Sequence, residues 1–223
     1  MQLRIFDPVI KLKTLFSRIW QDRGGVAIIE TALVLPLLLF IGLGGMEVAY
    51  YVWTHSRVSQ IGLSAADNAS RIAVGSALGL PQVRENDIVE VFTGAEHQAN
   101  GMNFEQRGRI ILSSLEMNAD GGQWIHWQRC FGDLSYASSY GDAGEGQTGT
   151  SFVGMGPAGN ELQAPDGASV MFVEIAYEYR PLVLPNLLGT HVIRSTAAYT
   201  TREVRDLSRV YPFAGVTPDD CTS

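Results

Sequence analysis

The chain of 223 residues is long enough for one membrane helix and one globular domain of ordinary size. Hydrophobic residues make up 46% of it, while charged residues make up only 17% and glycine is abundant at 24 residues. This composition favours a β-rich domain with long turns over a helical bundle. The net charge of −7 argues against nucleic-acid binding, which depends on neutralising phosphates with Lys and Arg.

Positive charge is concentrated at the N-terminus. Residues 1–25 carry five basic and two acidic side chains, a net charge of +3 against −10 for the rest of the chain. Because basic flanks of membrane helices stay in the cytoplasm, we expect this leader to be cytoplasmic and the acidic remainder to be translocated. The leader is too long and too mixed for an ordinary secretory signal, although Gly42-Leu43-Gly44 is a weak small-x-small cleavage site.

Residues 26–53 form one apolar stretch with only two charged side chains, Glu30 and Glu47. As a helix this stretch is about 42 Å long, and about 20 apolar residues suffice to cross a bilayer. No other stretch approaches that length, so the sequence predicts a single transmembrane segment. A carboxylate inside such a segment is costly and by default marks a functional residue, which makes Glu30 a candidate. The alternative is a glutamate near the membrane interface that is neutralised or reaches water.

Helical spacing continues beyond the span and predicts one helix from about Val26 to Val74. Pro36 removes one backbone hydrogen bond and is expected to kink this helix. Tyr50, Tyr51 and Trp53 are typical of the aromatic belt that lies at lipid headgroups. The outer half of the helix is expected to lay its apolar stripe on a sheet.

The globular domain, residues 54–223, is predicted to be α+β. Asn86-Asp87 indicates the cap of a short helix. Four runs rich in β-forming residues then predict an antiparallel sheet packed on the long helix. These runs are 109–115, 123–130, 169–179 and 191–205.

Residues 132–166 form a long connection rich in Gly, Ser, Asp and Ala. Loops of this length are either functional or flexible, so it is both a candidate contact surface and a candidate solvated loop. The two cysteines, Cys130 and Cys221, both fall on the translocated side. An oxidising compartment favours a disulfide between them, and the alternative is two unrelated thiols.

Catalytic and ligand-binding motifs are weak. The run Gly154–Gly159 matches a dinucleotide fingerprint by letter, but the residues after it are too few for the helix that the fingerprint needs. The four histidines have no metal-ligand spacing, and the acidic turn 141–146 lacks the EF-hand pattern. We therefore expect no cofactor, no metal and no enzymatic activity.

The N-terminal residues resemble a known family. A glycine ending a basic leader, a glutamate at the fifth following position and an apolar helix are the pattern of type IV prepilins, here Gly25, Val26 and Glu30. The longer string from Arg23 to Pro36 is similar to the TadE-like minor pseudopilins of tight-adherence (Tad/Flp) pili, and the similarity covers roughly residues 23–75.

The resemblance implies cleavage between Gly25 and Val26 by a prepilin peptidase, and a role for Glu30 in assembly. It also implies a pilin-like globular domain, the bacterial inner membrane as location, and other pilins, pseudopilins and the Tad machinery as partners in adhesion or secretion. Major Flp pilins have Glu-Tyr at the fifth and sixth mature positions and are shorter chains, whereas here Thr31 follows Glu30. Both departures favour a minor subunit.

Two alternatives stay open. The chain is alternatively an uncleaved, single-pass anchored module whose external domain binds a surface or partner. An extracytoplasmic enzyme is the least supported alternative, because no catalytic constellation is present.

Overall fold

The computed structural model describes residues 24–72, 74–76 and 79–221. The chain divides into two compact units, one ending at Val48 and one beginning at Ala49, and helix α2 (Gly24–Arg71) contributes to both. The remaining elements are β1 (Val74–Ser76), β2 (Gly79–Gln82), α3 (Glu85–Gln98), α4 (Phe104–Arg107), β3 (Gly108–Met117), β4 (Gln123–Phe131), β5 (Val170–Tyr179), α5 (Pro185–Leu188) and β6 (His191–Thr200).

Helix α2 is the long helix that the sequence predicts. It is α-helical through Pro36, although proline donates no backbone hydrogen bond there. The helix ends at Arg71, slightly before the predicted Val74, because β1 and β2 pair as a short antiparallel hairpin. None of the four strands predicted from the sequence lies in this hairpin.

Four strands form one antiparallel sheet in the order β4-β3-β5-β6. Val173 in the middle of β5 lies opposite Leu112 of β3 and Ala197 of β6. The predicted α+β class with an antiparallel sheet of about four strands is therefore confirmed. The last strand ends at Thr200 and not at the predicted Arg205, whose side chain instead reaches the end of α2.

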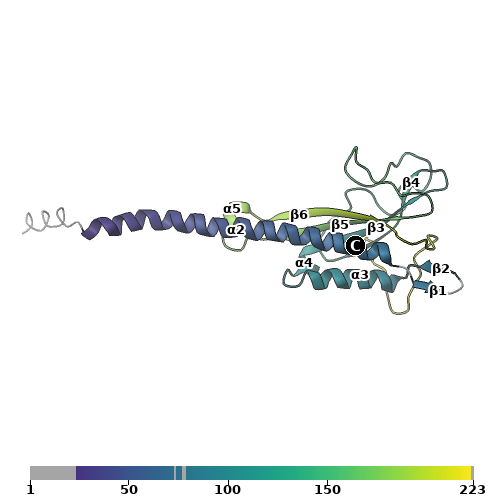
Figure 1. Cartoon of the computed structure of the whole chain (residues 1–223), viewed down its shortest axis with the longest axis horizontal. Coiled ribbons are helices and arrows are strands. Elements are labelled where there is room, and N and C mark those ends of the chain that lie inside the picture. Colours follow the sequence, from purple (N-terminus) through teal and green to yellow (C-terminus); the bar gives the residue numbers. More distant parts are fainter. Residues whose placement is uncertain (1–23, 73, 77–78, 222–223) are drawn as a thin grey trace, which may run out of the picture. The chain divides into compact units, whose positions relative to one another are not determined.

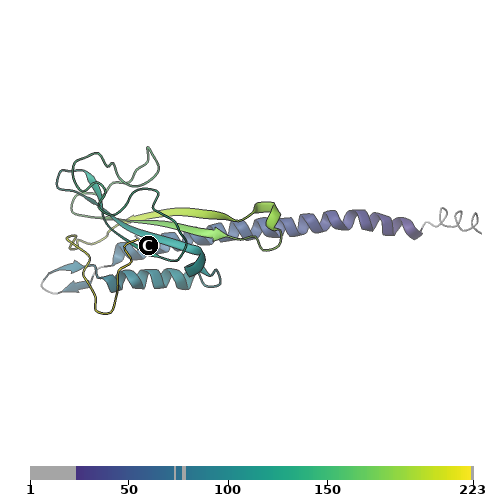
Figure 2. The ribbon, with the colours of Figure 1, turned by 180° about the vertical axis from the view of Figure 1, so that it is seen from behind.

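Within the second unit, residues 49–71 of α2 and helix α3 cover one face of the sheet (Figures 1 and 2). Their contact is close: a Cβ added to Gly62 would lie 3.0 Å from Cγ2 of Ile175 on β5. Apolar side chains from both helices and three strands make this core. It includes Val58, Ile61, Ala65, Ile88, Phe92, Ile110, Leu112, Val173, Ile175, Tyr179 and Ile193.

The segment between β4 and β5 covers the opposite face of the sheet (Figure 1). A second core of Leu115, Ile125, Met155, Ala164, Val170 and Phe172 lies beneath it. The backbone of Ile125 on β4 donates to the carbonyl of Glu145 (2.9 Å) and accepts from the amide of Gly144 (2.7 Å). Part of this segment is therefore packed on the sheet, while its role as a contact surface stays a prediction.

Helix α3 begins earlier than predicted. Asp87 is the third residue of the helix and not part of its cap, and its Oδ2 accepts a hydrogen bond from the backbone amide of Arg84 at 3.0 Å. The carboxylate of Asp87, in the first turn of the helix, thus accepts from the backbone amide of the N-cap residue Arg84. This interaction is one of the two hydrogen bonds of a capping box. Asp87 therefore correctly indicated this helix, but the predicted start was later in the chain than the observed start at Glu85.

Candidate functional site

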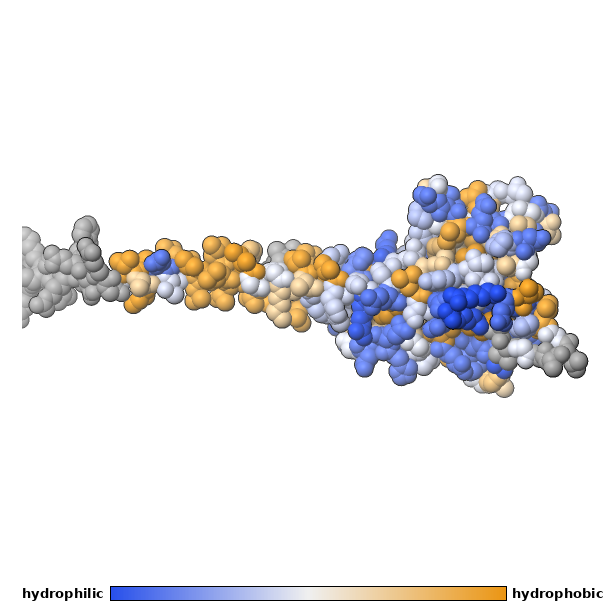
Figure 3. Space-filling model, viewed as in Figure 1, coloured by the Kyte–Doolittle hydropathy of each residue, from blue (hydrophilic) through white to orange (hydrophobic). Residues whose placement is uncertain are grey.

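The N-terminal part of α2 is apolar on every side. Its most hydrophobic stretch has a mean hydropathy of 2.5 over 18 residues, and none of these side chains is buried. Exposed side chains include Ile28 at 72% and Leu33 at 73%. In Figure 3 the visible face of this helix is almost entirely hydrophobic. A helix of this length and composition can cross a membrane, and its apolar surface needs lipid or other helices around it.

Glu30 interrupts this apolar surface. Its side chain is exposed, and none of the residues from 24 to 72, 74 to 76 or 79 to 221 pairs with it. The other acidic residue of the stretch, Glu47, is fully buried. Of the two carboxylates in the apolar stretch, Glu30 is therefore the one available to a group outside the described part of the chain.

Gly25, Val26 and Glu30 lie in the first two turns of α2. Side chains on a helix lean toward its N-terminus, and positions four apart share a face. The carboxylate of Glu30 therefore lies over the turn that begins at Val26. The neighbouring Thr31 bonds only within the helix, its Oγ1 donating to the carbonyl of Ala27 at 2.8 Å.

The predicted cleavage site, the peptide between Gly25 and Val26, is helical in this structure. Glycine disfavours helix by about 1 kcal/mol per residue, so the pair Gly24-Gly25 makes the first turn easy to open. Among the described residues, no atom outside the local helix backbone lies within 4 Å of a Cβ added at Gly25. Within the described part of the chain, Gly25 is therefore not packed against another element.

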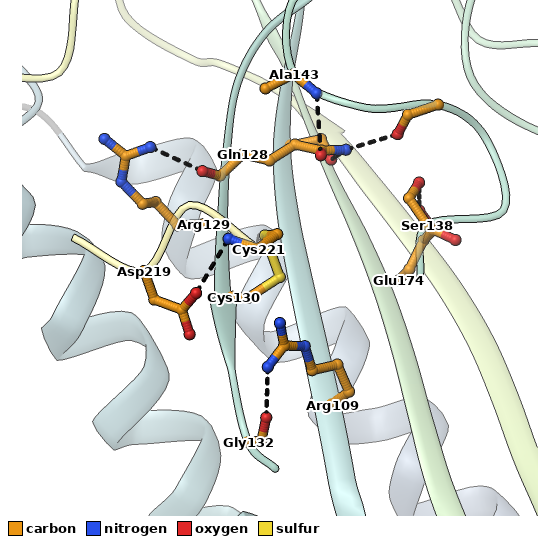
Figure 4. Close-up of a disulfide and its surroundings, with 12 residues drawn as sticks. Arg109, Gln128, Arg129, Cys130, Gly132, Ser138, Ala143, Glu174, Asp219 and Cys221 are labelled. Carbon is orange, nitrogen blue, oxygen red and sulfur yellow. Dashed lines mark hydrogen bonds between the residues drawn. A yellow bond between two sulfur atoms is a disulfide. The ribbon is translucent and has the colours of Figure 1, made fainter. Parts of the chain in front are cut away.

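Cys130 and Cys221 form a disulfide in the structure, joining β4 to the C-terminal segment (Figure 4). Beside it, the backbone amide of Cys130 donates to the carbonyl of Asp219 at 3.1 Å. On the preceding residue of β4, Arg129 Nε donates to Glu85 of α3 at 2.9 Å. The C-terminal segment is therefore fastened along the outer edge of β4 at the point where α3 also meets that strand.

The long segment between β4 and β5 is held by a buried carboxylate on the sheet. Glu174 accepts hydrogen bonds from the hydroxyl of Ser138 at 2.5 Å and from the backbone amide of Ser139 at 2.8 Å (Figure 4). Burial raises the pKa of Glu174, and these two hydrogen bonds oppose the shift. The sequence analysis missed this residue, because it stands among the apolar residues of β5 without a local partner.

Arg205 is a second buried charged residue with a structural role that sequence reasoning missed. Its buried guanidinium donates to the carbonyls of Ile72 (2.8 Å), Ser70 (3.4 Å) and Ala69 (3.5 Å) at the end of α2. Burial lowers the pKa of Arg205 to about 10. The side chain supplies the C-terminal cap that an α-helix otherwise takes from local residues.

The weak ligand motifs take structural roles. Around the fingerprint-like run, Met155 and Leu162 pair backbone to backbone as a small hairpin with no helix after it. His126 contacts Glu116 at 2.9 Å, and His191 lies beside Tyr51. No group of three potential metal ligands occurs among the residues that the structure describes.

Comparison with known proteins places the likeness in the long helix. Residues 25–73 match the family model described as TadE-like protein. No curated protein and no solved structure matches the chain. The resemblance that the sequence predicts for roughly residues 23–75 is thereby confirmed: the N-terminal helix is similar to TadE-like proteins, which supports involvement in a Tad-type pilus.

Proposed function

We propose that the chain is a membrane-anchored minor pseudopilin that acts in assembly of a Tad/Flp-type pilus and has no enzymatic activity. A prepilin peptidase cleaves it between Gly25 and Val26 on the cytoplasmic side of the bacterial inner membrane. The domain beyond the span lies on the other side, and the pilus serves adhesion or secretion. The partners are the peptidase, other pilins and pseudopilins, and the Tad machinery.

The observation that carries this proposal is the exposed carboxylate of Glu30 on the apolar surface of the first part of α2, one turn after Val26. Cleavage after Gly25 creates a new ammonium group at Val26. A buried carboxylate without a partner is expensive, whereas a paired one is tolerated. Glu30 of one subunit therefore favours the packing register that brings it to the ammonium group of a neighbour, and it penalises other registers.

The first experiment is to identify the N-terminal residue of the protein recovered from membranes, by intact mass and peptide sequencing. A chain that begins at Val26 supports prepilin-type processing. A chain that still begins at Met1 while the peptidase is active contradicts it and leaves the uncleaved anchored module. A start after Gly44 or Gly45 would mean ordinary secretion.

The second experiment separates assembly from anchoring. Glu30→Leu removes a carboxylate that is costly inside a membrane helix, so membrane retention should be unchanged or stronger. We expect this variant to be cleaved but to lose pilus assembly, while the control Thr31→Val assembles normally. Unimpaired assembly of Glu30→Leu would support the plain anchor.

A further inference from the structure

The connection between β5 and β6 is unusually apolar for a surface segment. Residues 181–189 contain four leucines, one valine and two prolines, with Asn186 as the one polar side chain and no charge. Leu182 is 58% exposed, and Val192, just after the connection, is 38% exposed. Val183 and Leu184 are half-buried, so Leu182 is the large apolar side chain that the described part of the segment exposes. Connections on a protein surface are normally polar, and an apolar one with an exposed leucine is a candidate interaction site.

Aromatic contacts fix the place of this segment in the globular unit. Tyr179, at the end of β5, has its ring 5.8 Å from Tyr50 and 5.2 Å from Tyr51. His191, at the start of β6, lies 5.2 Å from Tyr51. The segment therefore projects from the end of the sheet that lies beside residues 50–51, where α2 leaves its apolar stretch. The other end of the sheet is marked by Arg205, which reaches Ile72.

Amphipathic and basic side chains surround the same end of the unit. Trp53 is 49% exposed and stacks on Tyr50 at 5.9 Å, with the guanidinium of Arg57 5.4 Å from its ring. Arg180 directly precedes the apolar segment. Tyr and Trp rings with nearby cations are typical of the headgroup layer, whereas leucines favour the acyl boundary below it.

We propose that residues 181–189 form a second membrane contact, which inserts into the boundary between headgroups and acyl chains of the bilayer that α2 crosses. Leu188 packs on the core of the unit and holds the segment, while Leu182 is exposed toward the lipid. Continuity with the aromatic residues at the end of the span favours lipid as the occupant over a second protein. This inference rests on the membrane anchoring in the proposed function.

The consequence is attachment at two points. A domain held by one helix can rotate about it, whereas a second inserted segment fixes one end of the sheet against the bilayer. When a subunit leaves the membrane, the same leucines lose their lipid and need protein around them. Extraction of the subunit from the membrane should therefore be favourable only when neighbouring subunits cover this segment.

The test uses single spin labels on the full chain in vesicles of phosphatidylethanolamine and phosphatidylglycerol. Because both native cysteines are bonded to each other, one introduced thiol takes the label. The variants are Leu182→Cys in the segment, Leu39→Cys in the span and Val153→Cys as an exposed apolar control, at 53% exposure, in the segment between β4 and β5. The ratio of collisions with oxygen to collisions with a water-soluble nickel chelate reports membrane depth.

We expect this ratio at position 182 to exceed that at 153 several-fold and to approach the value at 39. If the ratios at positions 182 and 153 are equal while position 39 lies in an apolar environment, the inference is wrong, although α2 still anchors the chain in the membrane. A label at 182 that is shielded from both reagents also overturns it, because a protein surface then covers the segment. An aqueous position 39 overturns the anchor and the inference together. Unchanged amide-exchange protection in β5 and β6 shows that each labelled variant is folded.

Discussion

At the residue scale, Glu174 explains how a long glycine-rich segment stays on the sheet. Its carboxylate lies on the face opposite the helices and accepts from Ser138 and Ser139, residues 36 and 35 positions earlier in the chain. The same face bears Gln128, whose side chain donates to the carbonyl of Gly141 and accepts from the amide of Ala143. Two buried polar side chains therefore add to the few backbone hydrogen bonds that hold this segment on the sheet.

The buried Glu174 predicts a pH dependence. Burial raises its folded-state pKa, so the ionised form destabilises the folded state above that pKa, and the penalty disappears as pH falls toward the unfolded value near 4.5. Glu174→Gln keeps an acceptor and removes the charge. The free energy of unfolding of the natural chain minus that of the variant should therefore rise as pH falls from 7 to 4.5, measured by urea titration. A flat difference over this range would contradict the role of burial.

At the element scale, the sequence could predict what depends on local periodicity. The apolar repeat of α2, the four β-forming runs and the motif at Gly25 and Glu30 are all readable from neighbouring residues. The capping of α2 was not predictable, because Arg205 follows Ile72 by 133 residues and carries no local signal. The apolar run at 181–189 was visible in the sequence, but only the contacts of Tyr179 and His191 place it beside the end of the span.

Two arginines near the end of α2 give a matched test of capping. Arg205 is 4% exposed and donates to three helix carbonyls, whereas Arg202 has a side chain 54% exposed and pairs with Asp67 at 2.9 Å. Arg205→Met should reduce the free energy of unfolding by about 2–3 kcal/mol, because buried carbonyls lose their donor. Arg202→Met should change it by about 0–1 kcal/mol, as exposed ion pairs do. Equal effects in chemical denaturation would rule out the capping role.

At the scale of the whole molecule, the charge distribution and the disulfide both fit the proposed membrane orientation. A leader of net charge +3 precedes the apolar helix, and the acidic remainder contains Cys130 and Cys221, 91 residues apart. A cross-link over that separation stabilises by about 2–4 kcal/mol, and it persists only in an oxidising compartment. In the proposed orientation the basic leader stays in the reducing cytoplasm and both cysteines reach the compartment where they can bond.

This agreement makes the disulfide a reporter of orientation. Changing Lys11, Lys13 and Arg18 to Glu shifts the leader from +3 to −3 and removes the charge bias that retains it in the cytoplasm. A fraction of the chains should then keep Cys130 and Cys221 reduced, and a polymer-linked maleimide should shift both thiols on a denaturing gel. Exchanging Lys for Arg and Arg for Lys at the same positions preserves the charge and should leave the chain fully oxidised. If the acidic leader also yields only oxidised protein in unchanged amount, the leader charge does not set the orientation, and the apolar helix with its folded domain must do so.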